Sequence, residues 1–240
     1  MRRDIHSADV PILCRACEAR HKGVCGALDA QELLRLGRTS SRHEYDAGTT
    51  LVAAGERAEH CSNILSGVVK LSKILPDGRQ QVVELQFAPD FLGRPFGEES
   101  EVLVEAATDV RLCSFPRDML ETMMTGSSAL ENRMHRQALR QLDDARDWMM
   151  TLGRKSAGEK VASFLLMLAR DVRPQENGYS TSFDLPLGRS DIADFLGLTV
   201  ETVSRQLTKL RKEGVIEIEK TRQVEVADMK RLEAAAASAS

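Results

Sequence analysis

Apolar residues recur with different spacings along the chain, and each spacing predicts a different kind of element. Between His43 and Phe115 the apolar runs are short and separated by glycines, a pattern typical of a β-roll of short strands. Pro76-Asp77-Gly78 is the clearest hairpin turn between two such runs. The runs expected to form strands are Thr50–Val52, Asn63–Leu65, Val68–Ile74, Gln81–Leu85, Glu101–Val104 and Val110–Phe115.

Helical spacing appears in a short segment, Ala30–Leu36, and in a long one that begins after Pro116. The long segment keeps close to a heptad spacing over about six turns, so we expect a coiled-coil seam that Gly153 ends. A seam on one long helix predicts pairing with a second copy of the chain; packing on its own roll is the alternative. The expected seam residues are Leu130, Met134, Ala138, Leu142, Ala145, Met149 and Leu152.

The stretch Arg189–Gly214 predicts a helix-turn-helix with Gly197 in the tight turn. Ser190 is expected to cap the first helix and Thr199 the second, and the final glycine is expected to end the second helix. The spacing of apolar residues predicts one buried face on each helix. The residues expected on these buried faces are Ile192, Ala193, Leu196, Val200, Val203, Leu207 and Leu210.

The free face of the second helix carries side chains that suit the major groove of DNA. Arg205 can bond O6 and N7 of a guanine, Glu201 can accept from the N4 amine of a cytosine, and Ser204 can bond a base or a phosphate. Val215–Glu219 and Gln223–Val226 alternate apolar with polar residues and predict a small hairpin, or wing, beside this helix. We therefore expect DNA binding through this face; a solvated face on a small helical hairpin is the alternative.

Composition limits what the whole molecule can do. At 240 residues the chain fits two domains, so most of it lies outside the helix-turn-helix. Because the net charge is −3 and the pI is near 6.0, DNA affinity has to come from a local patch. Such a patch lies between Thr199 and Lys212, where four cations face one carboxylate, Glu201. No membrane span, signal core or catalytic motif is recognisable, so we expect a cytoplasmic protein without membrane contact or enzymatic activity.

Three of the five cysteines, Cys14, Cys17 and Cys25, fall within a dozen residues. A Cys-x-x-Cys loop can aim two sulfurs at one centre, and this density in a reducing compartment indicates metal or redox chemistry. The fourth ligand could be His21, which would give a zinc knuckle, or a distant cysteine, which would suit zinc or an iron–sulfur cluster. Unliganded thiols are the alternative. The nearby basic residues Arg15, Arg20, His21 and Lys22 would offset the negative charge of a thiolate-ligated cluster, although a solvated basic loop explains them equally well.

The other two cysteines lie in predicted strands. In the last strand, Val110 and Leu112 share one face with Ser114, while Cys113 lies on the opposite face. Cys61 begins an earlier strand, where a buried thiol that behaves as a small hydrophobe is expected.

A β-roll, a long seam helix and a winged helix-turn-helix, in that order, resemble the CRP/FNR family of bacterial transcription regulators over nearly the whole chain. The most specific matches are Leu196–Arg205, Leu152–Ala157 and the N-terminal cysteines. The resemblance implies an α+β fold with a cupin-like or cyclic-nucleotide-binding-like roll. The implied parts are a cysteine-rich segment (1–29), the roll sensor domain (30–115), a dimerisation helix region (116–153) and a winged helix-turn-helix domain (154–240).

In the oxygen-sensing FNR branch of this family, three N-terminal cysteines and one from the roll hold a [4Fe–4S] cluster that is intact without oxygen. Carried over by position, the ligands are Cys14, Cys17, Cys25 and Cys113. The spacing of two then seven residues is similar to the alphaproteobacterial members of this branch. The implied function is oxygen-responsive control of genes of anaerobic or microaerobic metabolism.

The resemblance also implies that Glu201, Ser204 and Arg205 read a half-site similar to TTGAT, with two subunits on an inverted repeat. The Pro76–Arg79 hairpin is implied as a contact for RNA polymerase. The cyclic-nucleotide branch clamps a phosphate with an Arg-Ser or Arg-Thr pair soon after a Gly-Glu. Gly97-Glu98 is present here, but no Arg or Lys lies between Glu98 and Glu105, so no cyclic nucleotide is expected.

Paired seam helices would bring acidic side chains at the seam edge close to their counterparts. Asp143, Asp144 and Asp147 would then repel one another across the two-fold axis, so we expect a marginal, switchable dimer, with Asp147 as the dimer switch. Two alternatives remain open: a thiol-redox or zinc-stabilised regulator without an iron–sulfur cluster, and a ligand-binding roll that acts through protein contacts.

Overall fold

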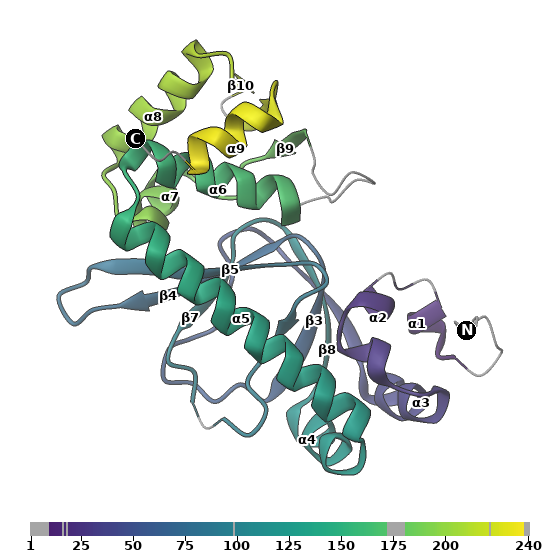
Figure 1. Cartoon of the computed structure of the whole chain (residues 1–240). Coiled ribbons are helices and arrows are strands. Elements are labelled where there is room, and N and C mark those ends of the chain that lie inside the picture. The colour runs from purple at the N-terminus through teal and green to yellow at the C-terminus, as the bar shows by residue number, and fades with distance from the viewer. Residues whose placement is uncertain are drawn as a thin grey trace. The chain divides into compact units, whose positions relative to one another are not determined.

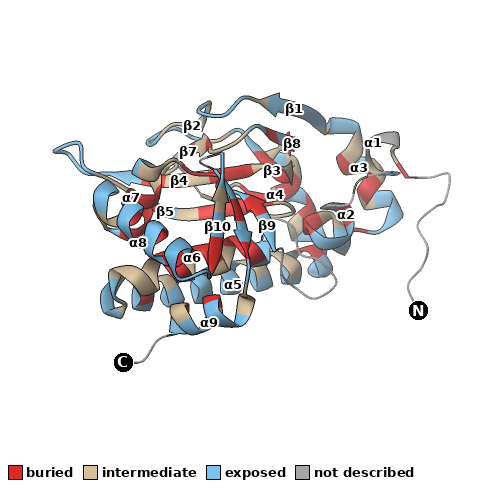
Figure 2. Ribbon diagram, turned by 90° about the horizontal axis from the view of Figure 1, so that it is seen from above, coloured by how far each residue is buried: buried red, intermediate tan, exposed pale blue. Residues whose placement is uncertain are grey.

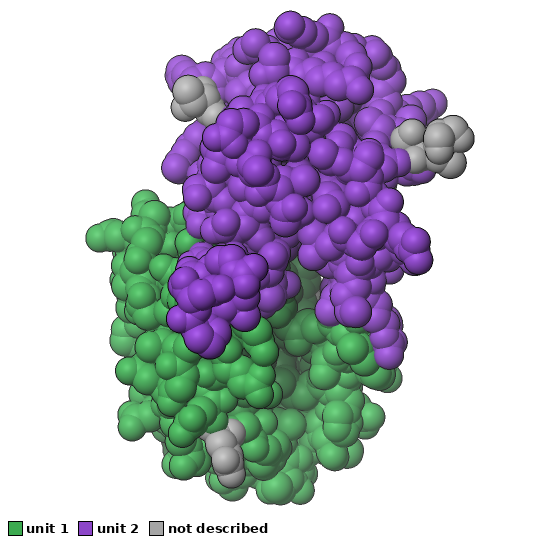
Figure 3. Space-filling model, turned by 90° about the vertical axis from the view of Figure 1, so that its left-hand side faces the viewer, with its two compact units in different colours: residues 1–74, 84–142 green, residues 75–83, 143–240 purple. Residues whose placement is uncertain are grey.

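The computed structural model describes residues 10–15, 17, 19–97, 99–171, 181–220 and 222–237. The chain forms two compact units (Figure 3): residues 1–74 with 84–142, and residues 75–83 with 143–240. The division falls inside the long helix, between Leu142 and Asp143, and it groups the tip of one hairpin with the C-terminal part of the chain.

The predicted β-roll is confirmed in the first unit (Figure 1). One sheet has the strand order β1-β8-β3-β6 and the other has the order β2-β7-β4-β5. Figure 2 shows that the buried residues concentrate in central strands such as β3 and β4. The strands are β1 Ser41–Tyr45, β2 Thr50–Val52, β3 His60–Ser66, β4 Val68–Ile74, β5 Gln80–Phe87, β6 Phe91–Leu92, β7 Leu103–Ala106 and β8 Val110–Pro116.

Each face of the β1-β8-β3-β6 sheet is covered by a separate core. On the inner face, Ile64 and Leu112 pack with Val69 and Val104 of the other sheet. The outer face is covered by N-terminal helices, which lie beside β3 and β8 in Figure 1. These helices are α1 Ile12–Arg15, α2 Ala19–Lys22, the 3₁₀ helix η1 Val24–Ala27 and α3 Ala30–Thr39.

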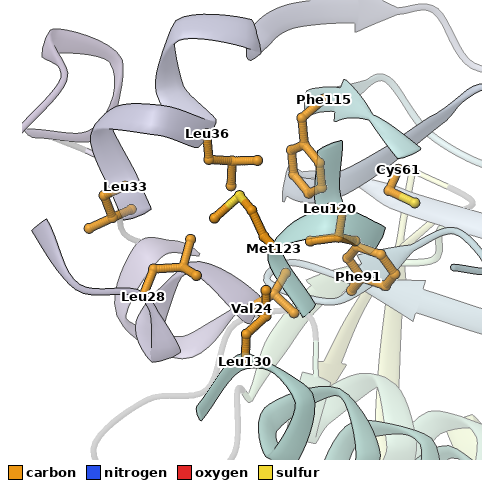
Figure 4. Packing of buried hydrophobic residues seen from close by; sticks show 10 residues of the cluster. All are labelled: Val24, Leu28, Leu33, Leu36, Cys61, Phe91, Phe115, Leu120, Met123 and Leu130. Atoms are coloured by element: carbon orange, nitrogen blue, oxygen red, sulfur yellow. The ribbon is translucent and has the colours of Figure 1, made fainter. Parts of the chain in front are cut away.

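The outer core is shown in Figure 4, where strand residues meet residues from four helical segments. Phe115 and Cys61 of the sheet pack towards Leu36 of α3 and towards Leu120 and Met123 of the helix after β8. α3 runs three residues beyond the predicted Leu36. A capping box at Asp29 and Glu32, with both hydrogen bonds at 2.8 Å, begins it. The N-terminal segment therefore folds as part of the roll.

The helical region after Pro116 is two helices, α4 Arg117–Gly126 and α5 Ser128–Arg154, so the expectation of one continuous helix was wrong. Ser127 adopts an extended conformation between them, which lets both helices bury apolar residues in the outer core. α5 also continues through Gly153, the predicted end of the seam. One glycine near a helix end costs about 1 kcal/mol, too little to stop this helix.

The seam residues of α5 divide into two groups. Leu130 is fully buried in the outer core, as the packing alternative would require. Further along, the seam residues Leu142 and Met149 are 45% and 73% exposed, and Leu139, which lies beside the predicted seam, is 61% exposed. This exposed apolar stripe is what a partner helix would cover.

The helix-turn-helix and the wing are confirmed in the second unit, where α7 and α8 are followed by a hairpin of β10 and β11. Two elements were not predicted. β9 pairs with β11 through Phe183 and Val224, and α9 contains the alanine run 234–237. Residues 172–180 and 238–240 lie outside the described residues. The elements are α6 Ala157–Asp171, β9 Ser182–Asp184, α7 Arg189–Leu196, α8 Val200–Lys212, β10 Ile216–Glu219, β11 Gln223–Val226 and α9 Met229–Ala237.

The ends of α7 and α8 match the predictions with one exception. Gly197 (φ 59°) ends α7 in the left-handed region, and Thr199 caps α8 by accepting from the N–H of Thr202 at 3.2 Å. The predicted cap at Ser190 is wrong, because α7 begins at Arg189 and its N-cap is Gly188, two residues earlier than predicted. Val200 was also expected to be buried, but it is 40% exposed because it is the first residue of α8, before the helix reaches the core.

Replacing Thr199 with Ala is expected to lower the free energy of unfolding by about 1 kcal/mol, because the N–H of Thr202 loses its acceptor. Ser190→Ala is the matched control: Ser190 is exposed and does not cap α7, so a change below about 0.5 kcal/mol is expected. Chemical denaturation of both variants measures the difference. Equal losses would show that the capping assignment is wrong.

Candidate nucleic-acid interface and thiol site

The three predicted DNA-reading residues, Glu201, Ser204 and Arg205, are all exposed on α8. The opposite face of the helix is buried through Val203, Leu207 and Leu210, which orients α8 with its polar face outward. Ser204 and Arg205 line an open hollow that continues along the helix. The other residues of the hollow are Thr208, Lys209, Lys212 and Glu213.

The charges on this face suit contact with bases and phosphates. The pKa of Glu201 is lowered by its own backbone N–H and by the Thr199 hydroxyl, so the side chain is an ionised acceptor at neutral pH. Lys209 lies 3.9 Å from Glu213, with both side chains exposed. Such an exposed pair is worth at most about 1 kcal/mol, so Lys209 can exchange this partner for a phosphate.

Aromatic side chains support α7, the helix before the reading helix. Phe195 of α7 packs against Trp148 with ring centroids 4.5 Å apart, and against the edge of Phe164 at 5.8 Å. The sequence analysis missed Trp148, which is half-buried and follows the charged residues Arg146 and Asp147.

The four cysteines predicted as metal ligands, Cys14, Cys17, Cys25 and Cys113, lie near one another in the structure, and we refer to them together as the thiol site. Every pair among them interacts electrostatically. Burial and then Cys113 raise the pKa of Cys25 to about 12, and burial and then Cys17 raise that of Cys113 to about 11. Burial raises the pKa of Cys14 as well, with Cys17 as the next cause. Cys113 therefore joins the N-terminal group, whereas the alternative fourth ligand, His21, is exposed.

A row of residues across the sheet positions Cys113. Arg42 of β1 and Asn63 of β3 are the direct strand partners of Cys113 in β8. Residues directly opposite on neighbouring strands point to the same face, so the thiol lies between a guanidinium and an amide. Arg42 partly offsets the rise in the pKa of Cys113 and of Cys14, as expected for a nearby cation.

Two glycines allow the N-terminal segment to close over this row. A Cβ atom on Gly37 would lie 2.5 Å from Cγ of Pro11, and one on Gly26 would lie 2.8 Å from the carbonyl oxygen of His21. Both distances are too short for a side chain. The Cβ of a residue at position 37 would also lie 3.9 Å from Sγ of Cys14, a contact that the sequence analysis did not predict.

Two buried polar side chains contact the thiol site. Arg20 is 4% exposed and donates from Nη1 to the carbonyl oxygen of Cys14 at 3.1 Å, while its Nε has no partner among the described residues. Asn63 is 3% exposed and donates from Nδ2 to Sγ of Cys25 at 3.3 Å. No three His, Cys, Asp or Glu residues in the described parts of the chain form a group that would hold a metal ion.

Cys61 lies apart from the thiol site and is fully buried, as predicted. Burial raises its pKa to about 12, and the charges that act on it are those of Arg117 and Glu121. In Figure 4 it lies beside Phe91 and Phe115, so it serves as a small hydrophobe.

Two other regions considered in the sequence analysis are the segment of Gly97 and Glu98 and the hairpin between β4 and β5. Glu98 lies outside the described residues, and the carbonyl oxygen of Gly97 accepts from Nη1 of Arg117 at 2.7 Å. In the hairpin between β4 and β5, Asp77 and Arg79 form an exposed ion pair at 2.8 Å. Among the described residues, no helix has the length and apolar character needed to cross a membrane.

The winged helix-turn-helix with its charged outer face defines a DNA-binding transcription regulator. Residues 159–235 match the Crp-like helix-turn-helix domain, and residues 42–127 match the cyclic nucleotide-binding domain. The chain belongs to the CRP/FNR family of transcription regulators, whose members act as dimers.

Named relatives cover almost the whole chain. A probable transcriptional activator of Rhizobium leguminosarum bv. viciae is 53% identical over 97% of this chain and 96% of its own length. The transcriptional activator protein FnrL of Cereibacter sphaeroides is 40% identical over 91% of this chain and 90% of its own. The solved structure of FixK2 from Bradyrhizobium japonicum has a TM-score of 0.76 and 31% identity, covering 84% of this chain and 99% of that one. The protein is therefore a regulator of the FNR and FixK type.

Proposed function

We propose that the protein is an oxygen-responsive transcriptional activator that binds inverted-repeat DNA as a homodimer when Cys14, Cys17, Cys25 and Cys113 hold a [4Fe–4S] cluster. The observation that carries this proposal is the gathering of four thiols from the two ends of the roll sequence. The names of relatives such as FnrL support the role of activator. By analogy with the family, the regulated genes would serve anaerobic or microaerobic metabolism.

The residues around the thiols fit such a cluster. Four thiolates would give the site a net negative charge, which the nearby cations Arg20 and Arg42 would offset. The buried Nε–H of Arg20 has no partner among the described residues, and a cluster sulfur would be a suitable acceptor. When bound, the cluster would supply a centre that oxygen oxidises and degrades.

The segment that carries Cys25 also contacts the start of the seam helix. Val24 and Leu28 share the outer core with Leu130 of α5, and both Cys25 and Met134 pack against that core. In addition, the guanidinium of Arg133 donates to the carbonyl oxygen of Lys22. A change in how the cysteine segment is ordered would therefore act directly on the first turns of α5.

The rest of α5 would then pair with a second copy through its exposed apolar stripe. Asp143 is partly neutralised by Arg146 at 3.1 Å on the same helix, whereas Asp147 is exposed at the seam edge. We therefore retain Asp147 as the residue whose repulsion makes dimerisation conditional. The dimer would hold two copies of α8 about one DNA turn apart, on half-sites similar to TTGAT. The exposed Asp77–Arg79 hairpin is the proposed contact for RNA polymerase.

Protein purified without oxygen is expected to be brown and to contain iron and acid-labile sulfide. It should bind an inverted-repeat probe more tightly than air-exposed protein, because paired seam helices present two reading helices. Metal analysis, an absorption spectrum and an anisotropy titration measure this. A colourless anaerobic preparation with unchanged DNA binding would overturn the proposed oxygen sensing by a cluster. It would not affect the assignment as a DNA-binding regulator. If the anaerobic protein contains no sulfide, and dithiothreitol restores the DNA binding that is lost in air, a thiol-redox switch would be favoured instead.

A further inference from the structure

Asn63 is a buried amide placed among apolar side chains. It lies in the middle of β3 with 3% of its surface exposed, and its strand partner on the other side is Phe91. Only one of its polar groups is used in the described residues: Nδ2 donates to Sγ of Cys25, while Oδ1 is buried without a partner. An unpaired buried polar atom costs about 1–3 kcal/mol. For folding alone, a leucine of similar size would be the better residue here.

The position of Asn63 beside two cysteines accounts for a buried amide in this strand. It is the direct strand partner of Cys113, and it donates to Cys25, which belongs to a different segment. The Asn63 side chain therefore lies beside two of the four thiols. Cys113 belongs to strand β8, and Cys25 belongs to the single turn of η1. A short helix of one turn does not by itself hold a side chain in one orientation.

A hydrogen-bond donor at this place would stabilise Cys25 as a ligated thiolate. A thiolate that binds iron can only accept hydrogen bonds, and hydrogen bonds to the sulfurs alter both the retention and the reduction potential of iron–sulfur clusters. The amide N–H of Asn63 is such a donor, and it is shielded from water.

We propose that Asn63 is a positioning residue of the thiol site, which orients Cys25 as a ligand and stabilises it by an N–H···S hydrogen bond. This inference rests on the proposed function, since it assigns Asn63 a role toward the same cluster. Asn63 would act through Cys25, without being a ligand itself.

The test compares Asn63→Leu, and Asn63→Ala in parallel, with wild-type full-length protein purified without oxygen. Iron loss to a competing chelator under nitrogen is expected to be on the order of tenfold faster in both variants, since outer-shell partners typically contribute at least that factor to metal affinity. The reduction potential of the bound cluster is expected to fall, because a hydrogen bond to sulfur favours the more negative, reduced state.

Ser62→Ala is the matched control. Ser62 is the neighbouring buried residue on β3, its hydroxyl bonds Ser114 at 2.8 Å, and it points to the opposite face of the sheet. Iron retention and potential are expected to match wild type. Wild-type protein without iron and sulfide would overturn the proposed function and this inference together. If wild-type protein contains the cluster but the Asn63 variants match it in iron retention and reduction potential, this inference alone would be overturned. The same conclusion would follow if Ser62→Ala changed iron retention and potential as much as the Asn63 variants do.

Discussion

Replacing Cys113 with Ser is expected to reduce the iron and sulfide retained after anaerobic purification by at least about tenfold, and to remove the oxygen dependence of DNA binding. Cys113 is the thiol that the sheet contributes to the site, and it interacts with Cys14, Cys17 and Cys25. A serine hydroxyl is a hard, weakly acidic ligand that replaces a soft thiolate poorly. Iron and sulfide assays with an anaerobic spectrum measure the loss.

Cys61→Ala is the matched control for this variant. Cys61 lies on the same face of the same sheet and is fully buried, whereas Cys113 is half-buried, and the charges that act on Cys61 are those of Arg117 and Glu121. Its removal should leave a small cavity that costs about 1 kcal/mol of stability, with iron content unchanged. Full iron content in Cys113→Ser, or equal loss in Cys61→Ala, would contradict the assignment of the fourth ligand.

Arg205→Ala is expected to weaken binding to the correct inverted repeat by about 1–3 kcal/mol, or roughly 5- to 150-fold, and to relax specificity at one base position. Arg205 is exposed on the outer face of α8, where its guanidinium can form two bonds to a guanine. Anisotropy titrations against probes with single base-pair substitutions measure the effect at each position.

Lys209→Ala is the matched control on the same helix. Lys209 is exposed beside the same hollow, and a phosphate contact from it would carry no sequence information. Its loss should weaken binding to all probes equally and lower the salt slope by about one. If Arg205→Ala behaves in the same way, then Arg205 contacts phosphate only.

Elements with a strong local signal were predicted well. The strands of the roll, the two helices of the helix-turn-helix and the wing were predicted from the spacing of apolar residues within each segment. Gly197 and Thr199 mark helix ends through local backbone and hydrogen-bond chemistry, which the sequence displays. The reading face follows directly, because a helix with one buried stripe exposes the residues between.

Three of the errors occurred where residues far away in the sequence decide the local structure. β9 contains one apolar residue, Phe183, and exists because β11 pairs with it. The alanines of α9 become helical because Leu232 and Ala236 are buried in the second unit. The break at Ser127 lets Leu130 of α5 enter the outer core. The residues of each of these segments do not by themselves indicate which distant residues the segment will contact.

The sequence by itself determined which residues could bind metal and which could read DNA, because thiol density and helical periodicity are local properties. Only the tertiary structure decided that Cys113 joins the N-terminal thiols, that Asn63 and Arg42 flank it, and that the segment of Cys25 packs against α5. The physical reason is strand pairing. The sheet places residues from three separate strands in one row, and burial then selects which side chains meet above that row.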